Sequence, residues 1–251
     1  FYDFFVVYYR LTGDLNKSLE YCKKQVALME MFPHFKESDS KKYLLTLTSL
    51  SLAELNLRKY DDLQQTLEKI KFIMLNYPAI KRLAFNAYYH TQLATYIDTA
   101  RFEKGILLIP DIEKIIIDFK GNTNKFAEAQ FYYRFFYLHF GAGEYSKALE
   151  WINKILNDNY IESAPGLYYT VRIVNLIVHL ELGNIDVLEY YIKSAQRHID
   201  KSKKMYGSEK ALLNFIKNII TKNSGDESLQ QAYKKLRKEL LEIFKDISEK
   251  T

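Results

Sequence analysis

The sequence contains few residues whose type and spacing suggest catalysis or metal binding. It has five histidines and a single cysteine, Cys22. His139 and His179 lie 40 residues apart, a spacing that could bring two imidazoles close together on neighbouring helical hairpins. Two ligands do not complete a zinc site, which uses three or four, so we expect both histidines to pack between helices. Cys22 falls at an apolar helix position, where a buried thiol is more common than a nucleophile.

Motifs for phosphate, dinucleotide or zinc-protease chemistry do not occur. The sequence contains no GxxxxGK[ST], no GxGxxG and no HExxH. Carboxylates such as Glu54, Glu128 and Glu181 are scattered along predicted helix surfaces, and acid–base catalysis requires groups that converge. We therefore predict that the protein is not an enzyme and uses no cofactor and no metal.

A twelve-residue pattern occurs five times along the chain and indicates the helices that would position any functional site. It reads GAGEYSKALEWI from Gly141, with echoes LTGDLNKSLEYC from Leu11, NLRKYDDLQQTL from Asn56, DTARFEKGILLI from Asp98 and ELGNIDVLEYYI from Glu181. The turn positions are 13, 58, 100, 143 and 183, which gives a period of 40–45 residues. Self-similarity at this period is typical of helical solenoids.

Apolar residues follow each turn at helical spacing. One lies two residues after the turn and another seven residues later, on the same helix face. We predict that the residues packing the repeats together are Leu15, Tyr60, Phe102, Tyr145, Ala148, Ile152 and Ile185. The segments before the fourth and fifth turns, 131–140 and 168–180, are apolar and free of Gly and Pro. Each unit is therefore predicted to be a helix, a tight turn and a second helix.

Proline and glycine positions mark the ends of the units. Pro33 and Pro78 each lie 20 residues beyond a turn and are expected to end a second helix, and Gly121 is expected to end the third unit. The predicted units are 1–35, 36–79, 80–122, 123–163 and 164–205, followed by a helical pair in 206–251. In that pair, apolar residues from 229 to 247 recur at spacings of four and three. This seam suits either a cap on the array or a coiled coil.

The fourth unit resembles the tetratricopeptide repeat (TPR). Gly143 matches the family's turn, Tyr145 its aromatic residue, Ala148 its small packing residue, and Tyr132 and Phe135 its large apolar places. The chain departs from the family in its longer period. The resemblance implies an all-α, right-handed α-solenoid of about five TPR-like hairpins with a C-terminal capping helix pair. The fifth unit is similar to the closing repeat of TPR-like bacterial proteins without an established role.

The same resemblance implies a peptide-binding groove lined by the first helix of each unit. It assigns to that groove His90, Ala94, Gln130, Tyr133, Tyr137, Thr170 and Ile173. Arg134 and Arg172 are cations within apolar helices, and each could either lie at the solvent edge or grip a peptide carboxylate. Tyr133 and Tyr137 lie on one helix face, where they could either bind a partner or pack between repeats.

Charge and hydropathy bound the partners. The net charge is +5, and residues 201–251 hold 12 Lys/Arg against 7 Asp/Glu. Because acids are interspersed there and no block of five like charges occurs, we expect a solvated helix surface and no nucleic-acid partner. No apolar run is long enough to span a membrane. One cysteine fits a cytoplasmic protein. The chain begins at Phe1 within an apolar pattern, which we interpret as part of a longer protein.

Function is predicted only at the level of class. The leading hypothesis is a scaffold for protein–protein interactions that binds a peptide or a helix in its groove. The alternative is the peptide- or small-ligand-sensing domain of a bacterial regulator. Oligomeric state and partner identity stay open.

Overall fold

All regular structure in the described part of the chain is helical, which confirms the all-α prediction. The computed structural model describes residues 2–32, 39–119, 125–157, 165–188, 190–193, 207–222 and 226–243. The chain forms two compact units, residues 1–123 and 124–251. No helix in the described ranges is long and apolar enough to cross a membrane.

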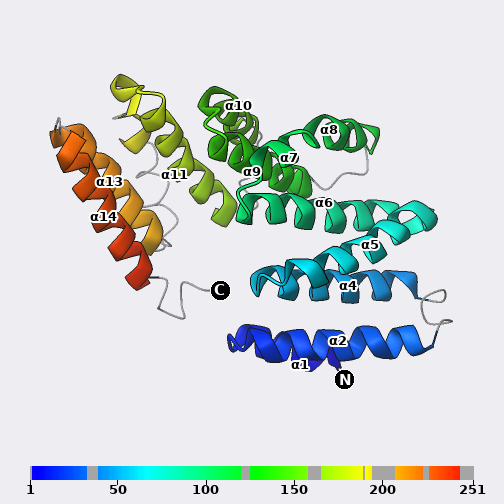
Figure 1. The fold of residues 1–251 in the computed structure, drawn as a ribbon. Helices are drawn as coiled ribbons and strands as arrows, with labels where there is room; N and C mark the ends of the chain where they lie inside the picture. Colours follow the sequence, from blue (N-terminus) through cyan, green and yellow to red (C-terminus); the bar gives the residue numbers. More distant parts are fainter. Residues whose placement is uncertain are drawn as a thin grey trace. The chain divides into compact units, whose positions relative to one another are not determined.

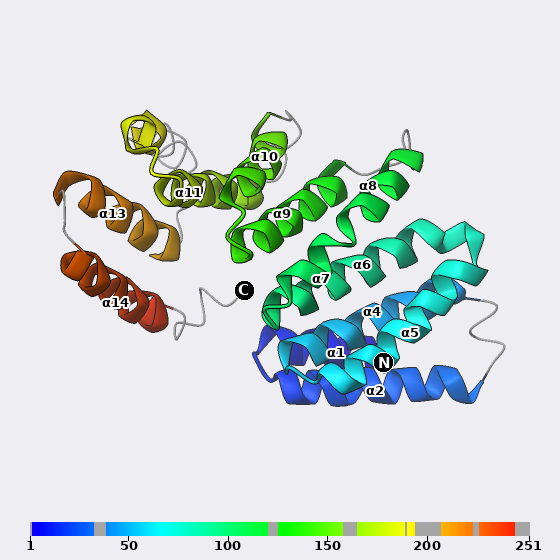
Figure 2. The same cartoon turned by 45° about the horizontal axis from the view of Figure 1, so that its top comes forward.

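The N-terminal unit is a series of helices in which successive helices pack against one another as far as α7 (Phe102–Ile106) (Figures 1 and 2). Its elements are α1 (Tyr2–Leu11), α2 (Leu15–Met31), α4 (Ser40–Asn56), α5 (Tyr60–Asn76), the short 3₁₀ helix η1 (Pro78–Ile80), α6 (Lys81–Asp98), α7 (Phe102–Ile106) and α8 (Ile109–Asp118). Besides these sequential contacts, α4 also touches α6. The first helices of two successive predicted repeats are therefore neighbours.

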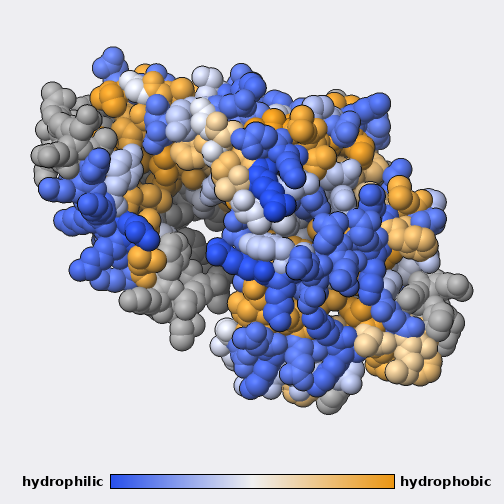
Figure 3. Space-filling model, in the orientation of Figure 1, coloured by the Kyte–Doolittle hydropathy of each residue, from blue (hydrophilic) through white to orange (hydrophobic). Residues whose placement is uncertain are grey.

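The C-terminal unit continues the same pattern of sequential packing. It contains α9 (Lys125–Gly141), α10 (Tyr145–Leu156), α11 (Pro165–Glu181), α13 (Gly207–Lys222) and α14 (Asp226–Ile243). Residues 185–188 and 190–193 are helical as well. The surface over α14 is largely hydrophilic in Figure 3.

All five predicted turn positions adopt the left-handed backbone conformation. Their φ angles are 80° at Gly13, 56° at Arg58, 52° at Ala100, 76° at Gly143 and 70° at Gly183. In the last four turns, the turn N–H donates to the carbonyl three residues earlier, and the next N–H donates to the carbonyl five residues before it. This is the Schellman motif, which satisfies the carbonyls that a helix end leaves exposed.

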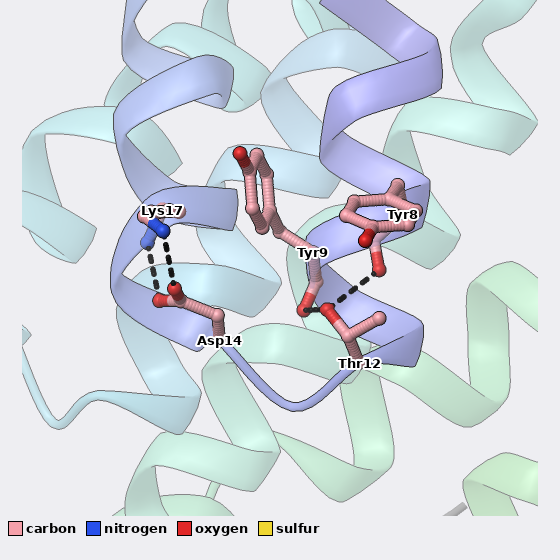
Figure 4. Close-up of polar contacts among 5 residues, drawn as sticks. All are labelled: Tyr8, Tyr9, Thr12, Asp14 and Lys17. Atoms are coloured by element: carbon pink, nitrogen blue, oxygen red, sulfur yellow. Dashed lines mark hydrogen bonds and ion pairs between the residues drawn. The ribbon is translucent and has the colours of Figure 1, made fainter.

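The first turn is held by the side chains of its own residues Thr12 and Asp14 (Figure 4). The Thr12 hydroxyl donates to the carbonyls of Tyr8 at 3.0 Å and Tyr9 at 3.3 Å. Asp14 accepts from the backbone N–H of Lys17 at 3.1 Å and pairs with the Lys17 ammonium group at 3.3 Å. Asp14 therefore caps α2, which stabilises the start of that helix.

The second helix of the second unit ends where proline predicts, and the third unit differs from its prediction. Helix α5 ends at Asn76, before Pro78. In the third unit, a single second helix was expected, but α7 stops at Ile106 and α8 starts at Ile109. Pro110 lies in the first turn of α8, where a missing N–H costs nothing, whereas within a continuous helix it would break a hydrogen bond. Pro33 and Gly121 lie outside the described residues.

The predicted packing residues differ in how deeply they are buried. Ala148 and Ile152 are fully buried, and Leu15, Tyr60, Phe102 and Tyr145 are half-buried. Ile185 does not fill the packing role predicted for it, because it is 42% exposed. Leu188 and Ile192 face the core instead, with Ile173, Leu176, Leu213 and Ile216 from α11 and α13. The predicted boundaries of the repeats and of the 206–251 segment stay predictions.

Candidate functional site

Helix α9 presents a row of uncharged side chains on one face. Phe126 is 40% exposed and Tyr137 is 36% exposed; Gln130 is exposed and Tyr133 half-buried. The spacings of four, three and four residues keep these side chains on one side of the helix. We call these four residues the α9 row, and three of them belong to the predicted groove.

The two tyrosines of the α9 row support each other. Their hydroxyl oxygens are 3.0 Å apart, and their rings meet edge to face with centroids 4.9 Å apart. The Tyr133 ring also stacks on Phe136 at 5.9 Å, and Phe136 is buried. A buried ring thus anchors Tyr133, so little side-chain freedom is left to lose when a partner binds. The pair offers aromatic surface together with hydroxyl groups that can donate or accept hydrogen bonds.

The other predicted groove residues do not join this row. Arg134 is half-buried on α9, and burial lowers the pKa of its guanidinium. Arg172 is half-buried on α11. His90 is half-buried on α6, in the N-terminal unit, whereas the α9 row belongs to the C-terminal unit. Ile173, also predicted to line the groove, is 1% exposed and lies in the core with residues of α13. Helix α13 therefore covers that position of the fifth unit.

Two exposed leucines on α4 occupy the positions that correspond to Gln130 and Tyr137. Leu45 and Leu52 lie 13 and 6 residues before the turn at Arg58, as Gln130 and Tyr137 lie before Gly143. Leu45 is 54% exposed and Leu52 is 42% exposed. The repeat register alone could have identified both leucines. Helices α4 and α9 thus both expose an apolar or aromatic group at the position of Leu52 and Tyr137, whereas Leu45 corresponds to the polar Gln130.

A pocket of about 380 Å³ opens among α2, α4 and α5, and no sequence signal indicates it. Phe72, Ile73 and Tyr77 supply much of its apolar wall. At its polar side, the Glu30 carboxylate accepts hydrogen bonds from the Tyr43 hydroxyl at 2.6 Å and from the Lys69 ammonium group at 2.8 Å. Burial is the main reason that the pKa of Tyr43 is raised, so this phenol stays a hydrogen-bond donor. Glu30, Tyr43 and Lys69 do not occupy equivalent positions in the repeats.

The residues considered for metal binding or catalysis have structural partners. His139 and His179 are buried. The His139 Nδ1 atom lies 2.6 Å from the Glu144 carboxylate, and the His179 Nδ1 atom lies 3.0 Å from the Asn184 amide nitrogen. Each histidine thus ties the end of a first helix to the residue after the turn. Across the described ranges, no group of three or more His, Cys, Asp or Glu could hold a metal ion.

The cysteine is a buried packing residue. Cys22 is fully buried, and burial raises the pKa of its thiol to about 11. A thiol with that pKa is almost entirely protonated at neutral pH, whereas the thiolate is the nucleophilic form.

Comparisons with known proteins identify no relative of this chain. No protein-family model, no curated protein sequence and no solved structure matches it.

Proposed function

We propose that the protein is a non-enzymatic scaffold that binds a peptide or a helix through the first helices of its TPR-like hairpins, arranged as a right-handed α-solenoid. One observation carries this proposal. Tyr137 of the α9 row and Leu52 of α4 expose an aromatic and an apolar side chain at the same repeat position, six residues before the turn. Exposed apolar groups that recur in register mark an interaction surface more strongly than scattered ones do.

The chemistry of the α9 row favours a peptide with little charge. Tyr133 and Tyr137 present ring faces and two hydroxyl groups, and Gln130 adds an amide that can donate and accept. Backbone amides of an extended peptide match such groups, and aromatic-lined grooves also accept proline-rich segments. The four side chains of the row carry no formal charge, so ionic recognition is a smaller part of the binding energy here.

Selection of peptides from a random displayed library tests the proposal. Peptides enriched on the wild-type protein are expected to bind Tyr133→Ala/Tyr137→Ala at least about tenfold more weakly, because a tyrosine at the centre of an interface contributes more than ~1 kcal/mol. The matched control is Tyr190→Ala, which removes a tyrosine that is 65% exposed elsewhere in the same unit.

Helicity of all three proteins is compared by circular dichroism. Failure to enrich any peptide, or equal losses in the double variant and the control, would refute the assignment of the site. Binding of a free small molecule in place of peptides would support the sensor alternative.

A further inference from the structure

Helix α14 carries four exposed cations within five residues, Lys234, Lys235, Arg237 and Lys238. Lys234, Arg237 and Lys238 lie on one face with Leu241, because residues four, three and one apart stay on that side of a helix. Glu239 and Glu242 line the groove between α13 and α14, and Lys238 lies at the edge of that groove. We call Lys234, Arg237, Lys238 and Leu241 the basic face of α14.

The basic face is fully presented to solvent. Lys234, Arg237 and Lys238 are all exposed, and Leu241 is 54% exposed. No ion pair joins any of these three cations to a residue in the described ranges. Lys235, between them in sequence, is exposed too. Four cations within five residues therefore keep their charge available for an external anion.

The opposite side of α14 is occupied by α13. Phe215 of α13 meets the Tyr233 ring with centroids 4.9 Å apart, and Leu236, Leu240 and Ile243 are half-buried. The seam predicted from the sequence thus faces α13, which fixes the basic face on the outside of this hairpin. A helix docked along one side and cationic on the other can lie flat on a charged surface.

From this geometry we propose that the basic face of α14 docks the protein on an anionic lipid surface. Clusters of four or more Lys/Arg on an amphipathic helix attract acidic headgroups. An exposed leucine among the cations can enter the boundary between headgroups and acyl chains, where apolar side chains are stabilised.

Two other anionic partners fit this surface less well. A partner helix would need apolar contacts at three- and four-residue spacing, and Leu241 is the only apolar member of the basic face as defined here. An exposed leucine would add nothing to the binding of nucleic-acid phosphates. Sites that bind phosphates usually combine cations with polar side chains.

Vesicle sedimentation of the full chain tests this proposal. Vesicles of phosphatidylcholine are compared with vesicles in which about one third of the lipid is phosphatidylserine. The wild-type protein should bind the acidic vesicles more tightly, and less so when salt rises from about 0.05 to 0.15 M, since salt screens the attraction. The variant Lys234→Gln/Arg237→Gln/Lys238→Gln should lose about 100-fold in partition coefficient, about fivefold for each cation removed.

The matched control removes the same net charge from another part of the chain. Lys81, Arg101 and Lys104 are exposed in the N-terminal unit, and Lys81→Gln/Arg101→Gln/Lys104→Gln should retain most of the binding. A further variant, Leu241→Ser, should weaken vesicle binding several-fold at unchanged net charge. Equal losses in the two charge variants, equal binding to both vesicle types, or tighter binding of a short duplex DNA than of acidic vesicles would overturn the proposal.

Discussion

Replacing Gly143 by alanine isolates the cost of the left-handed backbone at a repeat turn. The φ angle of Gly143 is 76°, and a Cβ atom added there meets no other heavy atom within 4 Å. Crowding by neighbours is therefore excluded, and only the local conformation opposes the methyl group. That conformation costs an L-residue about 1–2 kcal/mol. Alanine also restricts the unfolded chain, which returns about 0.4–1 kcal/mol, so we expect a net loss of about 1 kcal/mol in the free energy of unfolding.

The third turn supplies the reverse experiment within the same chain. Ala100 holds a φ of 52°, so Ala100→Gly relieves the strain and should raise stability by several tenths of a kcal/mol to ~1 kcal/mol, from the same two terms. Ala27 is an exposed residue in the interior of α2, and Ala27→Gly should instead cost about 1 kcal/mol. One substitution type is thus predicted to change stability in opposite directions at two positions.

Urea unfolding followed by circular dichroism measures all three variants. Because the chain has two compact units, agreement with a second probe such as tyrosine fluorescence is required before free energies are extracted. A change of 1 kcal/mol corresponds to roughly 2–4 °C in Tm for a chain of this size. The reasoning fails if Gly143→Ala unfolds at the same urea concentration as the wild type, or if Ala100→Gly and Ala27→Gly shift stability in the same direction.

The buried carboxyl of Glu54 and the paired carboxyl of Glu144 are expected to change the stability of the fold with pH in opposite directions. Burial raises the pKa of Glu54 above 4.5 despite a hydrogen bond from Thr66. The folded state then holds that proton more tightly, and its stability falls as pH rises from about 4.5 through the folded pKa. Glu54→Gln should therefore gain stability relative to the wild type between pH 4 and 7 in urea titrations, and a constant difference would contradict this. The hydrogen bond to His139 lowers the pKa of Glu144, so its contribution is present at neutral pH and lost in acid. Glu144→Gln should cost less than about 1 kcal/mol at pH 7, since its side chain is 39% exposed, and this cost should shrink as the pH falls through the folded pKa; a cost that does not change with pH would refute the pairing.

The turns were predictable from the sequence because they depend on local interactions. Gly13, Gly143 and Gly183 favour a left-handed turn by residue type, but Arg58 and Ala100 do not. Those two positions were found only by the 40–45-residue spacing, and both have positive φ. The repeat register thus located strained backbone that residue type alone would miss. The break between α7 and α8 was not predicted. The repeat pattern placed Ile109 at a packing position, where it is buried, and that pattern takes no account of Pro110, which follows it and cannot lie inside a continuous helix.

Side-chain sites were less predictable because they depend on partners far along the chain. The Glu30, Tyr43 and Lys69 group joins residues 13 and 39 positions apart, and no local pattern brings them together. Ile185 satisfied the repeat pattern of packing residues, yet the core in that unit is formed by Leu188 and Ile192 with residues of α11 and α13. Sequence periodicity states which face of a helix is apolar, but the neighbouring helix decides which part of that face is covered.

The same distinction explains why Tyr133 and Ile173 differ although both lie ten residues before a turn. Ile173 is in the core because Leu213 and Ile216 of α13 pack in the same cluster. Tyr133 is half-buried, with its hydroxyl turned toward that of Tyr137. A β-branched aliphatic side chain gains most from full burial, whereas a tyrosine has a polar end that needs a partner or water. The residue type at this register therefore distinguishes a fully buried aliphatic position from a half-buried tyrosine, and the proposed binding should be tested first at the α9 row.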